Sequence, residues 1–462
     1  MNMVQGEPAR SVFMDSGRPR KDGIVRGELP PVPIPATKRA MNQHPRGRHL
    51  VAADRRFATG GGPIARLMSG SFSRILGRID RGLEQGAIEA TLPDGSRRIL
   101  GGRRPGPRPV VHLHSWRALA RLIASGSVGW YKSWELGEWS SPDPVPLFEL
   151  FMLNAESLGA TARAKGLFRL VNSLAHRFRD NDKKRARENI SHHYDLGNDF
   201  YRAWLDESMT YSSAVFAEPF EPGEPLEAAQ ARKLDRLLGR LGLEPGQRLL
   251  EIGCGWGSLA ETAARDHGVA VVGLTISEAQ KAYAERRLEA AGLAGRCSIQ
   301  LTDYRDVDGL FDAVASVEMV EAVGRDYWPA YLESIARVLK PGGRAALQFI
   351  SIREPLFDDY AANADFIQTY IFPGGMLVSE SRLEALAAEA GLEWRDRKGY
   401  GLHYAETLKR WRRRYDEAVA QGRLPPGFDE PFHRLWRYYL MYCEGGFRGG
   451  GIDVAQVTLV KG

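Results

Sequence analysis

Glycine occupies positions 253, 255 and 257 in the segment 251–257, Glu-Ile-Gly-Cys-Gly-Trp-Gly, which directly follows an apolar run. Gly253 and Gly255 carry no side chain that would keep a ligand off the backbone, and Gly257 permits close packing of a strand against a helix. The helix N-terminus adds unpaired N–H donors, and Glu251 can hold a cationic or hydroxyl-bearing ligand. The segment therefore predicts a strand-to-helix turn that binds a nucleotide-like cofactor.

Strand-like and helical patterns alternate after this turn. The strand-like segments are residues 270–275, 297–301, 311–316 and 344–350, the last of which follows a tight turn at 340–343. This alternation predicts a parallel, doubly wound sheet. Because the glycine spacing is E-x-G-x-G-x-G rather than G-x-G-x-x-G, the series resembles class I methyltransferases that use S-adenosylmethionine. The resemblance implies an α/β, Rossmann-like fold with a mainly parallel seven-stranded sheet.

The length and the cysteine content limit the possible architectures. A chain of 462 residues is too long for one ordinary core, so at least two folded units are expected. The cysteines Cys254, Cys297 and Cys443 are too few and too scattered for a disulfide framework or a zinc cluster, which fits a reducing cytoplasm. We expect no metal. No segment has the uncharged apolar length that spans a bilayer, so any membrane contact is expected to be peripheral.

Positive charge is concentrated in the first part of the chain. Residues 1–180 contain 28 Lys and Arg against 15 Asp and Glu, a balance of +13, whereas the remainder has 35 against 42, a balance of −7. This asymmetry suggests an anionic partner, such as phospholipid headgroups, and no nucleic-acid motif accompanies it. A solvated face together with a basic tail explains the charge equally well.

Composition divides the chain into three parts. Residues 1–60 are rich in Arg, Pro and Gly and are expected to form a disordered basic tail. Residues 61–180 are expected to form a smaller α+β domain, with a strand at 110–113, a short helix at 116–124 and a Gly and aromatic block at 126–139. The tryptophans of that block either belong to the core or face an acyl chain or membrane interface.

The third part, residues 181–462, begins with a charged linker at 183–187 and contains blocks that also occur together in one enzyme family. The blocks are residues 193–201, 209–216, 274–280, 303–306, 318–324, 365–375, 403–404 and 438–447. With the glycine-rich turn, they resemble cyclopropane-fatty-acyl-phospholipid synthases and the related mycolic acid cyclopropane synthases. The sequence motifs Tyr-Ser-Ser-Ala-Val-Phe and Glu-Ala-Val-Gly resemble those of the branch that includes plant cyclopropane synthases. The resemblance is strong from residue 190 onward and looser over 110–155.

This resemblance implies a cytoplasmic enzyme, peripherally bound to the inner face of an anionic membrane, that acts on unsaturated phospholipids with S-adenosylmethionine as co-substrate and can form a homodimer. In the family, a cis double bond attacks the sulfonium methyl, and a base removes a proton from the new methyl as the ring closes. Because an alkene is a poor nucleophile, alignment and exclusion of water must supply much of the acceleration. Residues 61–180 would then form a lipid-binding domain.

Aromatic faces can stabilise the positive charge that this reaction leaves on the alkene. The candidates for such a lining are Phe366, Tyr370, Phe372, Phe432, Trp436, Tyr438, Tyr439 and Tyr442. For any single ring, ordinary core packing is the more common role.

The family pattern also assigns cofactor contacts. Carried over to this sequence, these are Tyr211 and Ser212 from before the sheet, Gly253 and Gly255 near the methionine moiety, Thr275 and Gln280 near the ribose, and Tyr304 and Arg305 flanking the adenine. Each has a structural alternative, but their joint placement at the carboxyl ends of strands favours a ligand.

For the base, the resemblance implies a bound bicarbonate held by Glu321, Tyr404 and the backbone of Ile350. A buried glutamate can accept the bicarbonate hydroxyl and draw off its proton. The sequence departs from many bacterial members at two positions, with Ser213 in place of a cysteine and Gln348 in place of a histidine. Either side chain can still donate a hydrogen bond to an anion.

Two further residues match family positions. Cys443 matches a cysteine regarded as an active-site residue, but attack by an alkene needs no covalent enzyme intermediate, so we expect it to pack the acyl channel. His193 either orients a loop over the cofactor or is a structural histidine.

Four functions fit these residues. The first is formation of cyclopropane fatty acyl chains, and the second is the same carbon methylation ending in a methyl or methylene branch. The third is methylation of a small amine, against which the aromatic, basic region before residue 180 argues. The fourth is non-catalytic lipid binding, which Glu321, Tyr404 and the glycine-rich turn disfavour.

Overall fold

The computed structural model describes residues 46–51, 69–159, 196–221, 223–363 and 365–462. The chain divides into two units, residues 1–42 and 43–462, and all described residues belong to the second. Apart from residues 46–51, which include α1 (Arg48–Val51), the predicted tail lies outside the described residues, as do the linker at 183–187 and His193. The predicted domain boundaries stay predictions.

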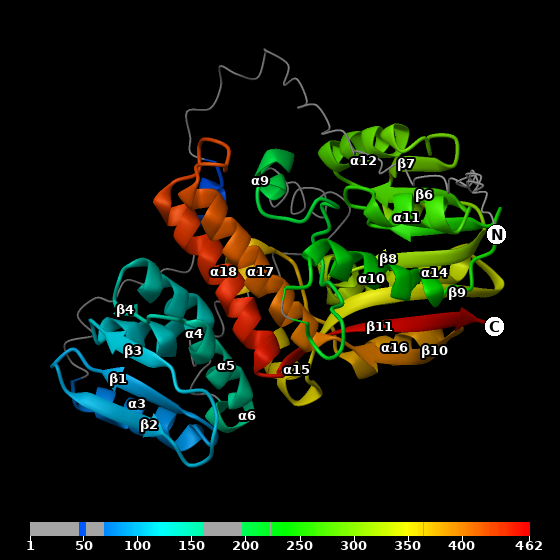
Figure 1. The fold of residues 1–462 in the computed structure, drawn as a ribbon. Coiled ribbons are helices and arrows are strands. Elements are labelled where there is room, and N and C mark those ends of the chain that lie inside the picture. Colours follow the sequence, from blue (N-terminus) through cyan, green and yellow to red (C-terminus); the bar gives the residue numbers. More distant parts are fainter. Residues whose placement is uncertain (1–45, 52–68, 160–195, 222, 364) are drawn as a thin grey trace, which may run out of the picture. The chain divides into compact units, whose positions relative to one another are not determined.

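A seven-stranded sheet with the order β10-β11-β9-β8-β5-β6-β7 forms the catalytic part (Figure 1). Its strands are β5 (Arg248–Ile252), β6 (Ala270–Thr275), β7 (Cys297–Leu301), β8 (Phe311–Val317), β9 (Leu339–Ile352), β10 (Leu392–Gly399) and β11 (Ile452–Lys461). Strands β7, β6, β5, β8 and β9 are mutually parallel, whereas β11 runs antiparallel to both of its neighbours. The predicted mainly parallel, doubly wound sheet is confirmed.

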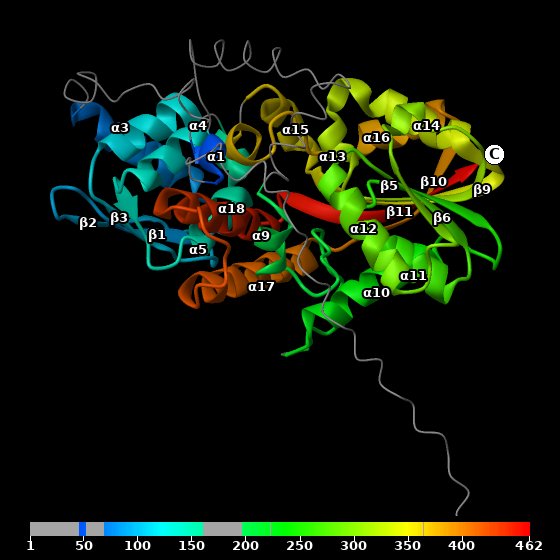
Figure 2. The same ribbon diagram turned by 90° about the horizontal axis from the view of Figure 1, so that it is seen from above.

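Helices cover both faces of this sheet because successive strand residues point to opposite sides (Figure 2). Leu249 packs in a cluster with α10, α11 and α12, whereas Leu250 packs in a second cluster with α13, α14, α15 and α16. These helices are α10 (Leu226–Gly239), α11 (Ser258–Asp266), α12 (Glu278–Ala290), α13 (Val320–Val323), α14 (Trp328–Val338), α15 (Glu354–Ala361) and α16 (Glu380–Glu389).

Two long helices, α17 (Gly401–Ala420) and α18 (Glu430–Arg448), pack side by side next to the sheet (Figure 1). Helix α18 also packs on α5 (Val145–Leu153). Short elements fill the connections: α9 (Asn198–Arg202), the 3-10 turns η4 (Tyr304–Asp306) and η5 (Arg325–Tyr327), and the π-helix η6 (Ile367–Ile371).

A second sheet of order β2-β1-β3-β4 confirms the smaller α+β part. Its strands are β1 (Ala87–Thr91), β2 (Arg97–Gly101), β3 (Val110–Leu113) and β4 (Trp139–Ser140), and its helices are α3 (Ser69–Gly82), α4 (Arg117–Glu135), α5 and α6 (Ala155–Leu158).

The predicted short helix at 116–124 is longer than expected, because α4 continues through most of the Gly and aromatic block across a kink at Ser125 and Gly126. Gly126 has a φ of 55°, and a Cβ on Gly129 would lie 2.0 Å from the carbonyl oxygen of Arg121. Glycine thus allows the two halves of α4 to approach each other.

Two tryptophans of this block, Trp130 and Trp139, pack in the core. The rings of Trp130 and Trp139 stack with centroids 4.4 Å apart, and only 5% and 1% of their surfaces are exposed. The indole Nε1 of Trp139 donates to the backbone carbonyl of Trp130 at 3.1 Å. For these two residues the core interpretation therefore holds. Among the described residues, no helix has the length and apolar character needed to cross a membrane.

The contact between α18 and α5 depends on the absence of a side chain at Gly445. This close packing generates a stability prediction. A Cβ on Gly445 would lie 2.4 Å from the Cβ of Phe148 and 2.8 Å from the backbone nitrogen of Glu149. We expect Gly445→Ala to lower the free energy of unfolding by about 1–3 kcal/mol through overpacking. Gly239→Ala is the control, because a Cβ there meets nothing within 4 Å. Urea unfolding of both variants measures the difference, and equal stabilities would contradict the packing argument.

Candidate active site

A cavity of about 360 Å³ opens at the carboxyl ends of β5, β6, β8 and β9, between the sheet and α17, α18 and η6. All of the predicted cofactor contacts line it: Tyr211, Ser212, Glu251, Gly253, Gly255, Thr275, Gln280, Tyr304 and Arg305. Of the predicted catalytic residues, Glu321, Ile350, Tyr404 and Cys443 also line the cavity. Ser213 and Gln348 are buried but do not line it.

The glycine-rich turn combines packing with open space. Gly253, Gly255 and Gly257 have φ values of 82°, 50° and 86°. A Cβ on Gly253 would lie 2.3 Å from the Cγ of Met319, and one on Gly257 would lie 3.0 Å from the Cβ of Ala284 in α12. In contrast, a Cβ on Gly255 would meet nothing within 4 Å. Gly255 therefore leaves room for a ligand, whereas its two neighbours allow close packing.

Buried Glu251 lies at the start of this turn. Burial raises the pKa of Glu251 to about 8, and nearby Lys233 opposes the rise. Among the described residues, its Oε2 has no hydrogen-bond partner. A buried carboxylate oxygen without a partner is costly, so a ligand with a cationic or N–H donor group would fit here.

The ends of β6 and β7 present polar groups at the other side of the turn. The hydroxyl of Thr275 donates to the Oε1 of Gln280 at 2.9 Å, which joins the two predicted ribose contacts. Asp303 accepts hydrogen bonds from the Nε of Arg305 at 2.8 Å and from its Nη2 at 2.7 Å. The guanidinium lies over the ring of Tyr304 at 5.4 Å. Asp303, to which the sequence assigned no role, therefore fixes the orientation of Arg305.

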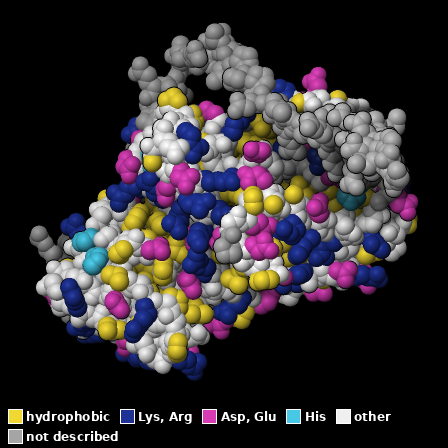
Figure 3. Space-filling view, viewed as in Figure 1, with side chains coloured by type: hydrophobic (Ala, Val, Ile, Leu, Met, Phe, Trp, Pro, Cys, Tyr) yellow, Lys and Arg dark blue, Asp and Glu magenta, His cyan; other side chains and the backbone are white. Residues whose placement is uncertain are grey.

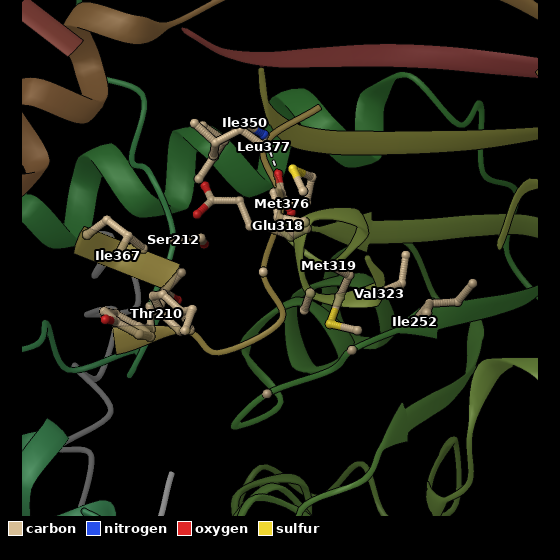
Figure 4. A pocket seen from close by; sticks show the side chains of 18 of the residues that line it. Thr210, Ser212, Ile252, Glu318, Met319, Val323, Ile350, Ile367, Met376 and Leu377 are labelled. Atoms are coloured by element: carbon tan, nitrogen blue, oxygen red, sulfur yellow. Dashed lines mark hydrogen bonds between the residues drawn. The ribbon is translucent and has the colours of Figure 1, made fainter. Parts of the chain in front are cut away.

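Glu318 receives hydrogen bonds from two donors predicted for a bound anion, Gln348 and Tyr404, and from the backbone of Ser213; the predicted donor of Ser213, its hydroxyl, instead donates to the carbonyl of Ala214 at 3.0 Å. Its Oε1 accepts from the backbone nitrogen of Ser213 and from the Nε2 of Gln348, both at 2.8 Å. Its Oε2 accepts from the hydroxyl of Tyr404 at 2.9 Å. Tyr404 was predicted to act together with Glu321, but its hydroxyl is bound to Glu318. Figure 4 shows Glu318 reaching into the cavity between Ser212 and Ile350.

Glu321 lies three residues further along the chain, and its Oε1 accepts from the backbone nitrogen of Ile350. Its Oε2 has no hydrogen-bond partner among the described residues. Burial, and then the charge of Glu318, raise the pKa of Glu321 to about 8. Two neighbouring carboxyl groups in one dry site are not readily ionised together, so Glu321 is the one that carries a proton at neutral pH.

Lys233 supplies the positive charge near these carboxylates. The side chain is only 1% exposed, and its Nζ donates to the hydroxyl of Ser212 at 2.8 Å. Burial lowers the pKa of Lys233 to about 8, while Glu318, Asp206 and Glu251 oppose that change.

Sequence reasoning assigned no role to Glu318 or to Lys233. Both had a detectable signal: Glu318 directly follows a strand at the ligand-binding edge of the sheet, and Lys233 stands next to Leu234 on the apolar side of α10.

The aromatic lining is smaller than predicted. Phe372, Tyr439 and Tyr442 line the cavity, and the hydroxyl groups of Tyr439 and Tyr211 are 2.8 Å apart. The other candidates are buried without lining it, so they act as core residues: Phe366, Tyr370, Phe432, Trp436 and Tyr438. Cys443 lines the cavity, and burial raises the pKa of its thiol well above the ordinary value. A neutral thiol fits a packing role better than a nucleophilic one.

A family model described as mycolic acid cyclopropane synthetase matches residues 181–457. The chain is 38% identical over 406 residues to the tuberculostearic acid methyltransferase of Mycobacterium tuberculosis, covering 87% of this chain and 93% of that protein. It is 34% identical over 355 residues to the cyclopropane-fatty-acyl-phospholipid synthase of Escherichia coli, covering 74% of this chain and 85% of the relative.

Solved structures of cyclopropane synthases are also similar to this chain. The cyclopropane synthase MmaA2 from Mycobacterium tuberculosis matches with a TM-score of 0.55 and 32% identity, over 60% of this chain and 98% of that one. The mycolic acid cyclopropane synthase CmaA1, complexed with SAH and CTAB, matches with a TM-score of 0.55 and 31% identity, over the same shares.

The open space at Gly255 generates a binding prediction. We expect Gly255→Ala to weaken binding of S-adenosylmethionine about tenfold or more, because the added methyl group occupies the cavity. Gly292→Ala is the matched control: its φ of 71° imposes a similar backbone strain, and its Cβ also meets nothing within 4 Å, but Gly292 does not line the cavity. Isothermal titration calorimetry measures both affinities. Equal affinities in the two variants would exclude a ligand at Gly255.

The raised pKa of Glu321 predicts a pH dependence of stability. Since its pKa rises from 4.5 to about 8 on folding, its contribution to stability is complete below pH 4.5 and is lost as the pH rises through 8. Glu321→Gln stays neutral and keeps an oxygen that can accept from Ile350. We therefore expect the free energy of unfolding to fall less between these pH values in the variant than in the wild type. Urea unfolding across that range measures this, and parallel curves would show that Glu321 does not titrate as described.

Proposed function

This chain belongs to the mycolic acid cyclopropane synthetase family, and from that premise we propose that it transfers a methylene unit from S-adenosylmethionine to the cis double bond of unsaturated acyl chains in phospholipids, forming cyclopropane fatty acyl chains. The chain is an S-adenosylmethionine-dependent methyltransferase of the lipid-modifying kind. The proposal concerns the finer points, which are the phospholipid substrate, the ring product and the residues that act.

One observation carries the proposal: a single cavity is lined by polar groups at the glycine-rich turn, by apolar side chains of α18 and η6, and by the partly buried carboxyl groups of Glu318 and Glu321. A polar, charged cofactor and a hydrocarbon chain need such contrasting surroundings, and the reaction between them needs a base at the boundary. A cavity for a small amine would need no apolar end of this kind.

The polar end fits S-adenosylmethionine, which when bound supplies an electrophilic sulfonium methyl group. Gly255 leaves the space, and the unpartnered oxygen of Glu251 can accept from an amino group. Thr275 and Gln280 stand where they can bind ribose hydroxyls, and Arg305 is held beside Tyr304 to form a side of an adenine pocket.

The apolar end fits an acyl chain. Phe372, Tyr439 and Tyr442 present aromatic surface, and Ile367 and Met376 add aliphatic surface (Figure 4). These side chains exclude water from a reacting alkene, and aromatic faces stabilise the positive charge that develops on it. The charge can therefore persist until a proton is lost.

A second candidate is carbon methylation that ends in a methyl or methylene branch. The observation that favours it is the relative named tuberculostearic acid methyltransferase, which matches over 93% of its length. The amine hypothesis gains no support, because the likeness to a coclaurine N-methyltransferase structure, at 20% identity, concerns the fold alone.

We also propose peripheral contact with an anionic membrane. Strand β2 exposes Arg97, Arg98 and Ile99, the last with 64% of its surface accessible. Figure 3 shows further Lys and Arg side chains over α17 and α18, but several of these pair with carboxylates, such as Arg412 with Glu444. The basic, partly apolar edge at β2 is the better docking surface.

The homodimer stays a prediction, which light scattering of the purified protein would test.

Lipid products test the function directly. Purified protein, S-adenosylmethionine and vesicles of unsaturated phospholipid are expected to yield acyl chains heavier by one CH₂, detected by mass spectrometry. NMR of the product then separates a three-membered ring from a branch. Membrane contact predicts faster conversion in vesicles that contain anionic lipid than in zwitterionic ones, and a difference that shrinks at high salt.

Saturated phospholipid is the control, because it offers no alkene. Modification of the saturated chains, or methylation of an added amine while unsaturated lipid stays unchanged, would contradict the proposal. A branched product would select the second candidate. Equal rates on both kinds of vesicle would argue against contact through the basic edge.

A further inference from the structure

The donors expected to hold a bicarbonate base are already engaged by the protein itself. Ser213, Gln348 and Tyr404 all donate to the carboxylate of Glu318, at 2.8, 2.8 and 2.9 Å. A carboxylate and a bicarbonate present the same planar pair of oxygens, so both would compete for the same donors. The residues present therefore do not fit a bound bicarbonate at this position.

The arrangement around Glu318 is suited to an anion. The backbone N–H of Ser213 can only donate, and the amide of Gln348 is oriented because its Oε1 accepts from the Nε2 of Gln456 at 3.0 Å. The nitrogen of Gln348 therefore faces Glu318. Lys233 adds a favourable positive charge. Together these groups stabilise the ionised form of Glu318 in the cavity.

The backbone also holds Glu318 in place. Its φ of 52° lies in the left-handed region, which is uncommon for residues other than glycine, and its nitrogen donates to the carbonyl of Gln348 at 2.7 Å. Strained backbone of this kind persists where the surrounding structure fixes it, and it is frequent at functional sites. Here it directs the side chain from the end of β8 into the cavity (Figure 4).

Burial affects Glu318 as a base as well. Burial raises its pKa, while the hydrogen bonds from Ser213, Gln348 and Tyr404 oppose the rise. A carboxylate with a raised pKa accepts a proton more readily than an exposed glutamate does.

We propose that Glu318 is the catalytic base of this enzyme and takes the place of a bound bicarbonate. The proposal rests on the alkene methylation proposed above. The π electron pair of the alkene forms the bond to the methyl carbon, and the sulfur keeps the electron pair of the broken carbon–sulfur bond. Glu318 then accepts a proton from the new methyl group, and the electron pair of that C–H bond closes the ring. The proton leaves Glu318 for water after the product departs.

Two variants test the assignment. Glu318→Gln keeps the shape of the side chain but cannot accept the proton, so turnover should fall about a hundredfold or more while the affinity for S-adenosylmethionine stays unchanged. Glu318→Gly removes the carboxylate, frees the three donors and relieves the left-handed backbone, which glycine adopts without strain. Bicarbonate added to Glu318→Gly should restore part of the lost turnover, and it should not restore Glu318→Gln, in which the space remains filled.

Binding of the anion provides a readout that does not depend on turnover. The ¹³C NMR line of labelled bicarbonate should broaden on addition of Glu318→Gly and stay sharp on addition of wild type or Glu318→Gln. Wild-type turnover should also be the same in carbon-dioxide-free buffer with and without added bicarbonate.

The outcomes separate the two proposals. A wild-type enzyme that forms the lipid product only when bicarbonate is present, or a Glu318→Gln variant with full turnover, would overturn the assignment of Glu318. A wild-type protein that modifies no lipid under any condition would overturn the proposed function instead. In that case the NMR experiment still decides whether Glu318 occupies the anion site, and broadening by the wild type would refute this.

Discussion

The need to stabilise charged groups away from bulk water determines the rest of the site. Glu251, Glu318, Glu321 and Lys233 all line the cavity; Glu251 and Lys233 are buried, and Glu318 and Glu321 are partly buried. Removing a charged group from water costs several kcal/mol, so each must be paired, hydrogen-bonded or neutral. Glu318 has three donors and Lys233 nearby, whereas Glu321 is neutral at physiological pH. The reaction cannot take place in a cavity open to water, because water would capture a cation formed from an alkene.

The register of two neighbouring strands produces this arrangement. Val317 of β8 pairs with Gln348 of β9, so Glu318 follows β8 at the level where the side chain of Gln348 meets it. Two residues later in β9, Ile350 offers its N–H to Glu321. A slip of one residue would turn Gln348 to the opposite face of the sheet and remove one of the two hydrogen bonds that the Oε1 of Glu318 accepts. The sheet is therefore the scaffold that fixes the distances between the reacting groups.

Much of the fold was predictable from sequence because its signals are local. Strand-like segments separated by helical patterns predicted the strands at 270–275 and 297–301 with the observed ends. The helix over 117–135 was cut short in the prediction, since glycine usually ends a helix and the compensating packing of Gly129 on Arg121 is not visible in a sequence. The sequence did not distinguish the aromatic rings of α18 that line the cavity from those that pack in the core. A helix buried on most sides gives no signal for which of its faces meets a cavity.

The role of Glu318 could not be read from its position in a motif, because it depends on donors from three distant segments. Ser213, Gln348 and Tyr404 meet only in the fold. A base that belongs to the chain differs physically from a diffusible one. It is always present and already oriented, so no reorganisation is needed when the alkene becomes charged. Its burial, however, costs free energy in every folded molecule, with or without substrate. Lys233, buried for the same reason, offsets that cost, which explains why a lysine stands among the leucines on the apolar side of α10.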